Sequence, residues 1–205
     1  MPRPPELSAR AVALKPSLTL AIGAQAKALQ RAGRDICSLS AGEPDFDTPD
    51  FIVEATRQAL RDGITRYGPA AGDPELRAAV AEKLSSGNGI ATSPEQVLIT
   101  NGGKQAIYNL FQVLLNPGDE VLLPAPYWLS YPEMAALAGA KVKLIPTQAG
   151  EGFRLDLTAV EAAISPRSRL LVLNSPGNPT GRVMERQELE GVADLVRRHP
   201  QLLVM

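Results

Sequence analysis

The segment with the strongest chemical signal is Asn174-Ser-Pro-Gly-Asn178-Pro-Thr-Gly181, which directly follows the apolar run Arg169–Leu173. Two X-Pro bonds and two glycines within eight residues impose a rigid and unusual backbone path. In open α/β sheets, ligands bind outside the carboxyl ends of the strands, where the Asn178 carboxamide can donate to a ligand oxygen. Asn-Pro or Pro-Gly alone is typical of a plain turn, but the whole string after a strand favours a binding site.

A second signal is Thr100-Asn-Gly-Gly-Lys-Gln105, between a predicted strand and a predicted helix. Gly102 and Gly103 leave backbone N–H groups unshielded at a helix N-terminus, where the helix dipole attracts an anion such as phosphate. The spacing matches neither the Walker P-loop nor Gly-x-Gly-x-x-Gly. A tight strand-to-helix connection therefore explains this segment equally well.

Two further loops follow predicted strands. Pro124–Trp128 carries the only tryptophan, whose indole can stack on a planar heterocycle, although a lone tryptophan is more often core packing. Ala41–Asp45 can bring a bare amide at Gly42 to a carboxylate. The acidic residues of this second loop lack the spacing of a calcium loop, so we interpret it as a solvated turn and predict no metal site.

The other candidate residues are weak. His199, the only histidine, precedes a proline in a predicted loop, so a histidine-dependent triad has little support. Surface placement is the default for every lysine except Lys104. The single cysteine, Cys37, cannot form an internal disulfide, which agrees with a reducing compartment.

These loops need elements to position them, and apolar runs alternate along the chain with helical patterns. The predicted strands are Ile36–Ser40, Val97–Thr100, Glu120–Pro124, Lys141–Pro146, Arg169–Asn174 and Leu202–Met205. Helical spacing of apolar residues occurs at 52–60, 76–84, 106–114 and 189–196. The alternation predicts an α/β fold with a mostly parallel sheet that is buried on both faces.

Local signals predict where two of these helices begin and end. Thr48-Pro49 and Asp73-Pro74 each place a capping oxygen before a proline at the first helical position. Gly63 and Gly87 lie where left-handed terminators are expected.

Composition excludes several classes of protein. The 205 residues carry 21 Lys and Arg against 22 Asp and Glu, so the charge predicts neither a nucleic-acid partner nor an anionic membrane partner. The longest stretch without a charged residue, Gln105–Gly118, is 14 residues, shorter than the roughly 20 of a membrane-spanning helix. Met1–Leu7 has no signal-peptide pattern, and we predict a cytoplasmic protein.

The apolar run Leu202–Met205 stops at the last residue. We therefore expect the sequence to be the N-terminal portion of a longer protein. An unpaired apolar sheet edge would then favour association and poor solubility.

Taken in order, these loops resemble the first half of a class I/II aminotransferase, a fold type I enzyme dependent on pyridoxal 5′-phosphate. The resemblance covers essentially the whole chain and is closest to the bacterial aspartate aminotransferase subgroup. It implies a three-layer α/β sandwich, truncated, with an N-terminal arm and small-domain segment at 1–46 and an incomplete large domain at 47–205. The matching segments are Lys15-Pro16-Ser17, Ala41–Pro49, Tyr67, Gly102–Ala106, Pro126–Pro132 and Asn174–Gly181.

The resemblance also implies roles for cofactor contacts. Asn178 hydrogen-bonds the phenolic oxygen of the cofactor, Trp128 stacks on its ring, and the loop of Gly102, Gly103 and Lys104 holds its phosphate. Tyr67 reaches the phosphate of a neighbouring subunit, which implies a homodimer.

Substrate contacts are implied at four of the chain's residues. Gly42 contacts the substrate carboxylate, and Trp128 and Asn178 also face the substrate. Many relatives have hydroxyl residues in the phosphate loop where this chain has Gly102 and Lys104. Lys104 is therefore expected to touch the side-chain carboxylate of a dicarboxylic substrate. The family also implies cis peptide bonds at Ala125-Pro126 and Asn178-Pro179.

The family's Schiff-base lysine, its pyridine-binding aspartate, a neighbouring tyrosine and the arginine that binds the α-carboxylate are all expected beyond Met205. No catalytic residue is therefore assigned within the chain. Losing a general base costs about 10²- to 10⁴-fold in rate, so we expect the 205-residue chain alone to be inactive.

The function implied is transfer of an amino group from an amino acid, with aspartate favoured, to a 2-oxo acid. A prephenate or aromatic aminotransferase of the same fold is the alternative among enzymes. A non-catalytic sensor or interaction module with the same fold is the alternative outside them. A downstream lysine in a Ser-x-Ser/Ala-Lys context would favour the enzyme.

Overall fold

The computed structural model describes residues 6–14, 16, 18–40 and 42–205. Two compact units are present: one is Leu18–Gly103, and the other joins Lys104–Met205 with the described residues before position 17. The boundary between residues 46 and 47 that the sequence suggested stays a prediction.

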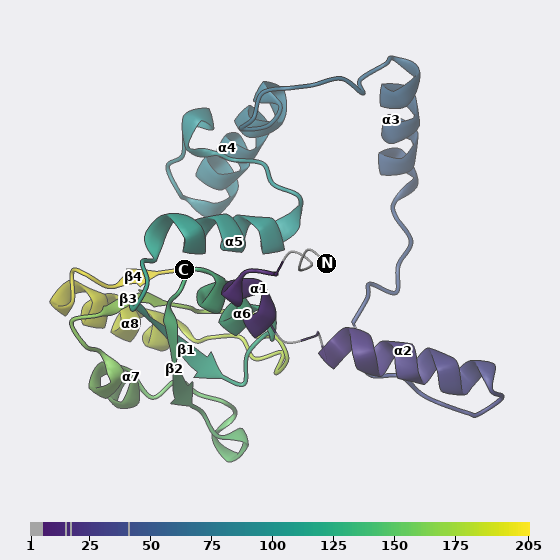
Figure 1. Cartoon of the computed structure of the whole chain (residues 1–205). Coiled ribbons are helices and arrows are strands. Elements are labelled where there is room, and N and C mark those ends of the chain that lie inside the picture. The colour runs from purple at the N-terminus through teal and green to yellow at the C-terminus, as the bar shows by residue number, and fades with distance from the viewer. Residues whose placement is uncertain (1–5, 15, 17, 41) are drawn as a thin grey trace. The chain divides into compact units, whose positions relative to one another are not determined.

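The unit that contains Lys104–Met205 is built on a four-stranded sheet in the order β2-β1-β3-β4 (Figure 1). All three pairings are parallel, which confirms the predicted sheet type. The central strand pairs on both sides, for example through Leu122 with Lys143 and with Leu171. The strands are β1 (Glu120–Ala125), β2 (Lys141–Pro146), β3 (Ser168–Leu171) and β4 (Leu203–Val204).

Helices cover both faces of this sheet. Val121 and Leu123 of β1 pack into the core formed with α5 (Gly102–Leu114) and α6 (Ser130–Leu137). Leu122, between them, packs into the opposite core formed with α7 (Leu157–Ala163) and α8 (Arg186–Arg198). Successive strand residues point to opposite faces, so this apolar run serves two cores and makes the three-layer α/β sandwich. The same unit holds the short helices α1 (Ala9–Ala13) and η2 (Ala149–Glu151).

The order of the strands creates a switch point between β1 and β3. From β1 the chain passes through α6 to β2, and from β2 it returns through α7 to β3 on the other side of β1. The loop after β1 therefore leads to a helix on one face, and the loop after β3 leads to α8 on the other. Two loops that leave neighbouring strands toward opposite faces open a crevice between them.

The unit Leu18–Gly103 is helical in its described residues, and both strands predicted there are wrong. Ile36–Ser40 forms no ladder, and Leu39 is 92% exposed. At Val97–Thr100 the backbone bonds are local or isolated, such as Ile99 N–H to Ala71 O at 3.0 Å. An apolar run becomes a strand only when a neighbour completes its hydrogen bonds. The elements present are α2 (Leu18–Arg31), α3 (Asp50–Arg61), α4 (Pro74–Asn88) and η1 (Pro94–Gln96).

Two of the four predicted helix boundaries are confirmed. Asp73 caps α4 by accepting from the Leu76 amide at 3.0 Å, and Gly63 ends α3 at φ 72°. Thr48 is not the cap of α3, because Pro49 occupies that position and no side chain caps the helix. Gly87 is also wrong, since α4 continues past it and ends at Gly89, at φ 68°.

The described residues contain neither a membrane-crossing helix nor a cluster of metal-ligating side chains. No helix there combines the length and apolar character that a membrane crossing requires, and no group of three metal-ligating side chains is found.

Candidate functional site

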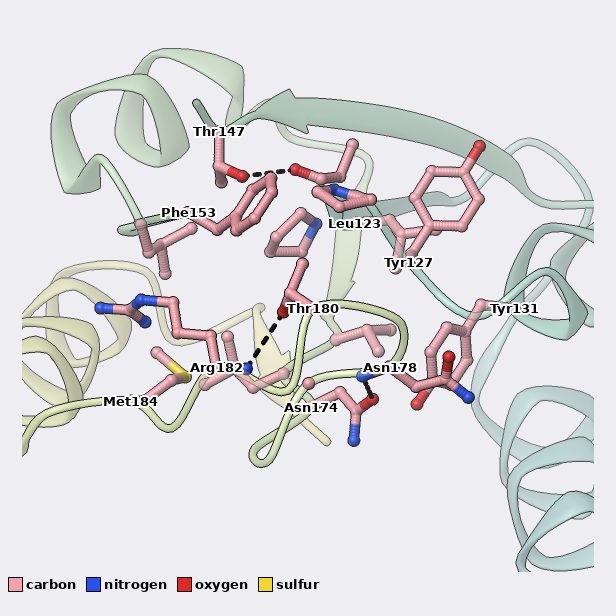
Figure 2. Close-up of a pocket in the computed structure, with 17 residues that line it drawn as sticks. Leu123, Tyr127, Tyr131, Thr147, Phe153, Asn174, Asn178, Thr180, Arg182 and Met184 are labelled. Atoms are coloured by element: carbon pink, nitrogen blue, oxygen red, sulfur yellow. Dashed lines mark hydrogen bonds between the residues drawn. The ribbon is translucent and has the colours of Figure 1, made fainter. Parts of the chain in front are cut away.

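A pocket opens where the carboxyl ends of β1 and β3 separate (Figure 2). One wall is Leu123–Tyr127, which continues β1, and the other is Val172–Asn174 with Gly177 and Asn178, which follow β3. This is the location that the strand order predicts for a ligand. The remaining lining residues come from α6 and from the segments that lead to α7 and α8: Tyr131, Thr147, Phe153, Leu155, Thr180, Arg182 and Met184.

The loop after β3 is held by its own hydrogen bonds. The Asn178 amide donates to Asn174 Oδ1 at 2.8 Å, and the Gly177 amide donates to Arg182 O at 2.8 Å. A Cβ at Gly177 would lie 2.8 Å from Thr180 Oγ1, closer than real Cβ contacts, so the loop requires glycine there. These bonds use the Asn178 backbone and leave its exposed carboxamide to face a ligand.

The loop after β1 presents Trp128. The half-buried indole meets the Tyr131 ring edge to face, with centroids 5.3 Å apart and planes at 88°. Lys104 Nζ lies 5.2 Å from the centroid of the indole ring. Of the predicted cofactor contacts only Asn178 lines the pocket; Trp128 lies outside the lining but contacts the lining residue Tyr131, and Lys104 lies next to Trp128.

A hydrogen bond from Thr147 holds this loop, and burial changes the pKa of Tyr131 beside it. Thr147 Oγ1 donates to Ala125 O at 2.6 Å, which ties the end of β2 to the end of β1. Burial raises the pKa of the Tyr131 phenol, so the hydroxyl keeps its proton at neutral pH and can donate a hydrogen bond.

The start of α5 supplies backbone amides beside Lys104. Gly102 and Gly103 are the first residues of this helix, and Gly102 has φ 77°. A Cβ at either glycine would meet no atom within 4 Å, so the backbone here is open. The Gly102 amide donates to Thr100 O at 2.8 Å, so the anion-attracting character of this end comes from the helix dipole, the following amides and the positive charge of Lys104.

Tyr67 and Gly42 lie in the other unit, and their predicted roles stay predictions. Tyr67 is fully exposed, and Gly42 is also exposed. Lys15, Ser17 and Ala41, which carry part of the family resemblance, lie outside the described residues.

Both cis peptide bonds expected from the family, Ala125-Pro126 and Asn178-Pro179, are confirmed. A third, Ser175-Pro176, is also cis and was not predicted.

The sequence analysis missed several residues of the pocket. Tyr131 follows Trp128 by three positions at the start of a helix, and this spacing was the available signal. Thr147, Phe153 and Arg182 come from distant segments and carried no local signal.

Fold and site together define a class: an α/β protein with an exposed carboxamide in a crevice at the switch point of a parallel sheet, and with an indole and a lysine ammonium beside that crevice. Comparison with known families specifies it further. The model of the aminotransferase class I and II family matches residues 34–205, and the chain belongs to this family. The family is dependent on pyridoxal phosphate.

Individual relatives agree. The aspartate/prephenate aminotransferase of Thermus thermophilus is 52% identical over 198 residues, which are 97% of this chain and 51% of that protein. A bifunctional aspartate aminotransferase and glutamate/aspartate-prephenate aminotransferase of Petunia hybrida is also 52% identical, over 97% of this chain and 42% of its own length. The chain spans about half the length of the curated relatives it matches.

Solved structures show the same fold. The aspartate aminotransferase from Thermus thermophilus with maleate superposes with a TM-score of 0.93 at 50% identity, over 98% of this chain and 53% of that one. The aspartate aminotransferase of Thermotoga maritima superposes with a TM-score of 0.90 at 38% identity, over 97% of this chain and 52% of that one.

Proposed function

We propose that the protein to which this chain belongs is an aminotransferase that moves an amino group from an amino acid, preferably aspartate, to a 2-oxo acid. The observation that carries the proposal is that Asn178 lines the crevice while Trp128, with Lys104 next to it, contacts Tyr131 in the crevice wall, in a chain from a pyridoxal-phosphate-dependent family.

The residues at the crevice fit the cofactor's chemical groups. The Trp128 indole offers a flat surface for a pyridine ring, and the exposed Asn178 carboxamide can donate to a phenolic oxygen. The Gly103 amide at the start of α5 suits a phosphate, whereas the Gly102 amide donates to Thr100 O at 2.8 Å. When bound, pyridoxal phosphate supplies an electron sink for the carbanion formed at the substrate's α-carbon.

Lys104 supports a dicarboxylic substrate. Its ammonium stands 5.2 Å from the indole centroid and is exposed, so it can pair with a second carboxylate beside the ring. We propose that Gly42 contacts the other carboxylate, and that Trp128 and Asn178 contact both cofactor and substrate.

A second substrate is favoured by the relatives. The Thermus thermophilus and Cereibacter sphaeroides relatives are both aspartate/prephenate aminotransferases. Prephenate carries two carboxylates, so the same Lys104 can serve it. The test compares full-length wild type with full-length Lys104→Met, each assayed for amino transfer with aspartate and with prephenate. The variant should lose activity with dicarboxylic substrates only.

We also propose a homodimer in the cytoplasm, with Tyr67 reaching the phosphate bound by the neighbouring subunit. The full exposure of Tyr67 within its own unit supports this role. Tyr67→Phe in the full-length dimer should weaken cofactor binding without changing the mass measured by light scattering.

The 205-residue chain on its own should not transaminate. A lysine that anchors the cofactor and moves the α-proton is not among the residues assigned at the crevice. Aspartate-to-oxoglutarate transfer by the purified chain would contradict this, and the same assay on full-length protein should be positive. An inactive full-length protein would favour the sensor or interaction module.

Cofactor binding by the chain itself has a built-in reporter. Trp128 is the only tryptophan, so pyridoxal 5′-phosphate stacked on it should quench the chain's tryptophan fluorescence saturably. Asn178→Ala should weaken this binding about tenfold, the value of a hydrogen bond to a charged oxygen. Quenching that never saturates would overturn the proposed site.

A further inference from the structure

A buried ion pair lies behind the loop that carries Asn178. An Arg182 guanidinium nitrogen donates to Glu188 Oε2 at 2.5 Å. The Glu188 side chain is 3% exposed and that of Arg182 is 18% exposed. Arg182 also lines the pocket, as Figure 2 shows.

Glu188 is fixed to rigid elements independently of Arg182. Its Oε2 accepts from the Glu185 amide at 3.0 Å, which caps α8, and its Oε1 accepts from the Leu155 amide at 3.1 Å, just before α7. Burial acts to raise the pKa of Glu188, but the bonds from Arg182 and these two amides lower it overall, so the group is charged at neutral pH.

Arg182 transmits this anchorage to the loop through its backbone. Its carbonyl oxygen accepts from the Gly177 amide at 2.8 Å, and its amide donates to Thr180 Oγ1 at 3.2 Å. Gly177 directly precedes Asn178, so residue 182 braces the backbone from which the carboxamide projects.

We propose that Arg182, held by Glu188, is a positioning residue that fixes the Asn178 carboxamide for its contact with the cofactor's phenolic oxygen. The inference rests on the proposed function, because it assumes that this contact is made. It adds two residues, one of them at the third position of α8, to the machinery of the site.

The capping of α8 alone does not require Arg182. The Glu185 amide bond to Glu188 caps the start of α8 without it, and the Leu155 amide bond ties Glu188 to the segment before α7. A guanidinium enclosed here loses hydration, and a buried carboxylate without a partner is strongly destabilising. The pair is therefore best removed as a whole, with Arg182→Met and Glu188→Gln together.

The test compares two probes on the 205-residue chain by Trp128 fluorescence: pyridoxal 5′-phosphate and its 3-O-methyl ether, which lacks the phenolate charge. Wild type should prefer the phenol about tenfold. The double variant should lose most of this preference, while its affinity for the ether stays within about twofold. Arg182→Lys, which keeps the charge, should recover part of it.

Arg186→Met is the matched control. Arg186 pairs with Glu190 at 2.9 Å on the same helix, but both side chains are exposed, and the pair does not touch the loop. The Arg186→Met variant should prefer pyridoxal 5′-phosphate over the 3-O-methyl ether as strongly as wild type does.

Hydrogen exchange adds a readout that needs no ligand. The Gly177 amide should exchange about tenfold faster in the double variant and stay unchanged in the control. Unchanged exchange, or a preference retained by the double variant, overturns the positioning role alone. Absence of any preference in wild type overturns the proposed Asn178 contact, and the positioning role with it.

Discussion

Polar side chains at the two ends of strand β1 differ in burial and in hydrogen bonding. At its first residue, the Glu120 carboxylate is 3% exposed and is enclosed by its partners. Beyond its last residue, the exposed Asn178 lines an open crevice, and the half-buried Trp128 and the exposed Lys104 lie beside the Tyr131 wall of that crevice. Glu120 receives the Ser165 hydroxyl at 2.5 Å, Lys143 Nζ at 2.9 Å, the Ser168 hydroxyl at 3.2 Å and an Arg167 nitrogen at 3.2 Å.

We interpret the Glu120 end as a contribution to stability and the crevice end as the candidate binding site. Among the described residues, no buried side-chain nitrogen or oxygen lacks a hydrogen-bond partner, and the Glu120 carboxylate is satisfied by partners within the chain. At the crevice, the exposed Asn178 and Lys104 side chains keep donors that are open to solvent and to a ligand. A strongly perturbed pKa therefore marks the structural end here, not the site.

Glu120→Ala should produce the largest loss of stability. It removes a buried charge and leaves two serines and two cations without their acceptor, so the free energy of unfolding should fall by about 3 kcal/mol. Urea denaturation measures this. Arg167→Ala, whose side chain is 68% exposed, should cost under about 1 kcal/mol. Equal losses would show that the enclosure of Glu120 is unimportant.

Acid should lower the free energy of unfolding through Glu120, at the same end of the sheet. The bond from Ser165 and those from Lys143 and Ser168 hold the pKa of Glu120 at about 2, below its ordinary 4.5. The unfolded chain therefore binds more protons between these values, and stability falls as pH drops through them. Glu120→Gln lacks this titration. The stability gap between wild type and Glu120→Gln should narrow from pH 6 toward pH 2, and a constant gap would refute the shift.

Gly177→Ala should produce a smaller loss, confined to the crevice. The new Cβ meets Thr180 Oγ1 at 2.8 Å and Asn174 O at 3.4 Å, so the loop must shift at a cost of about 2 kcal/mol. The matched control is Gly150→Ala, where a Cβ meets nothing within 4 Å. If Gly150→Ala proves equally damaging in thermal unfolding, the close approach at Gly177 is not the cause.

The two asparagines of the loop should show the smallest effects on stability, and the two substitutions should differ in whether they change stability or cofactor binding. Asn174→Ala removes the acceptor of the Asn178 amide and should cost about 1 kcal/mol of stability. Asn178→Ala keeps that backbone bond and should change stability by less than about 0.5 kcal/mol while weakening cofactor binding. Paired unfolding and fluorescence titrations decide this. A loss of stability in Asn178→Ala would show that the Asn178 side chain stabilises the fold, which would contradict its proposed role in ligand binding.

Much of the sheet unit could be predicted from sequence because its apolar runs find parallel neighbours: β1 is buried over its first four residues, whereas β2, at the edge of the sheet, buries only Ile145. Glu120–Pro124 and Lys141–Pro146 read as strands, and the structure has them within one residue. The runs at Ile36–Ser40 and Val97–Thr100 looked the same but form no ladder. Apolar character is a property of the residues, whereas a strand also needs a neighbour.

The sequence by itself indicated the loops around Asn178, Trp128 and Lys104 as candidate site segments, because their prolines and glycines restrict the local backbone and a helix start attracts anions, and the roles of these residues stay predictions. Only the tertiary structure decided that these loops lie at or beside one crevice and which distant groups support them. The reversal of strand order at β1 and β3 and the Glu188 anchor of Arg182 depend on packing between segments far apart in the chain, which no local pattern encodes.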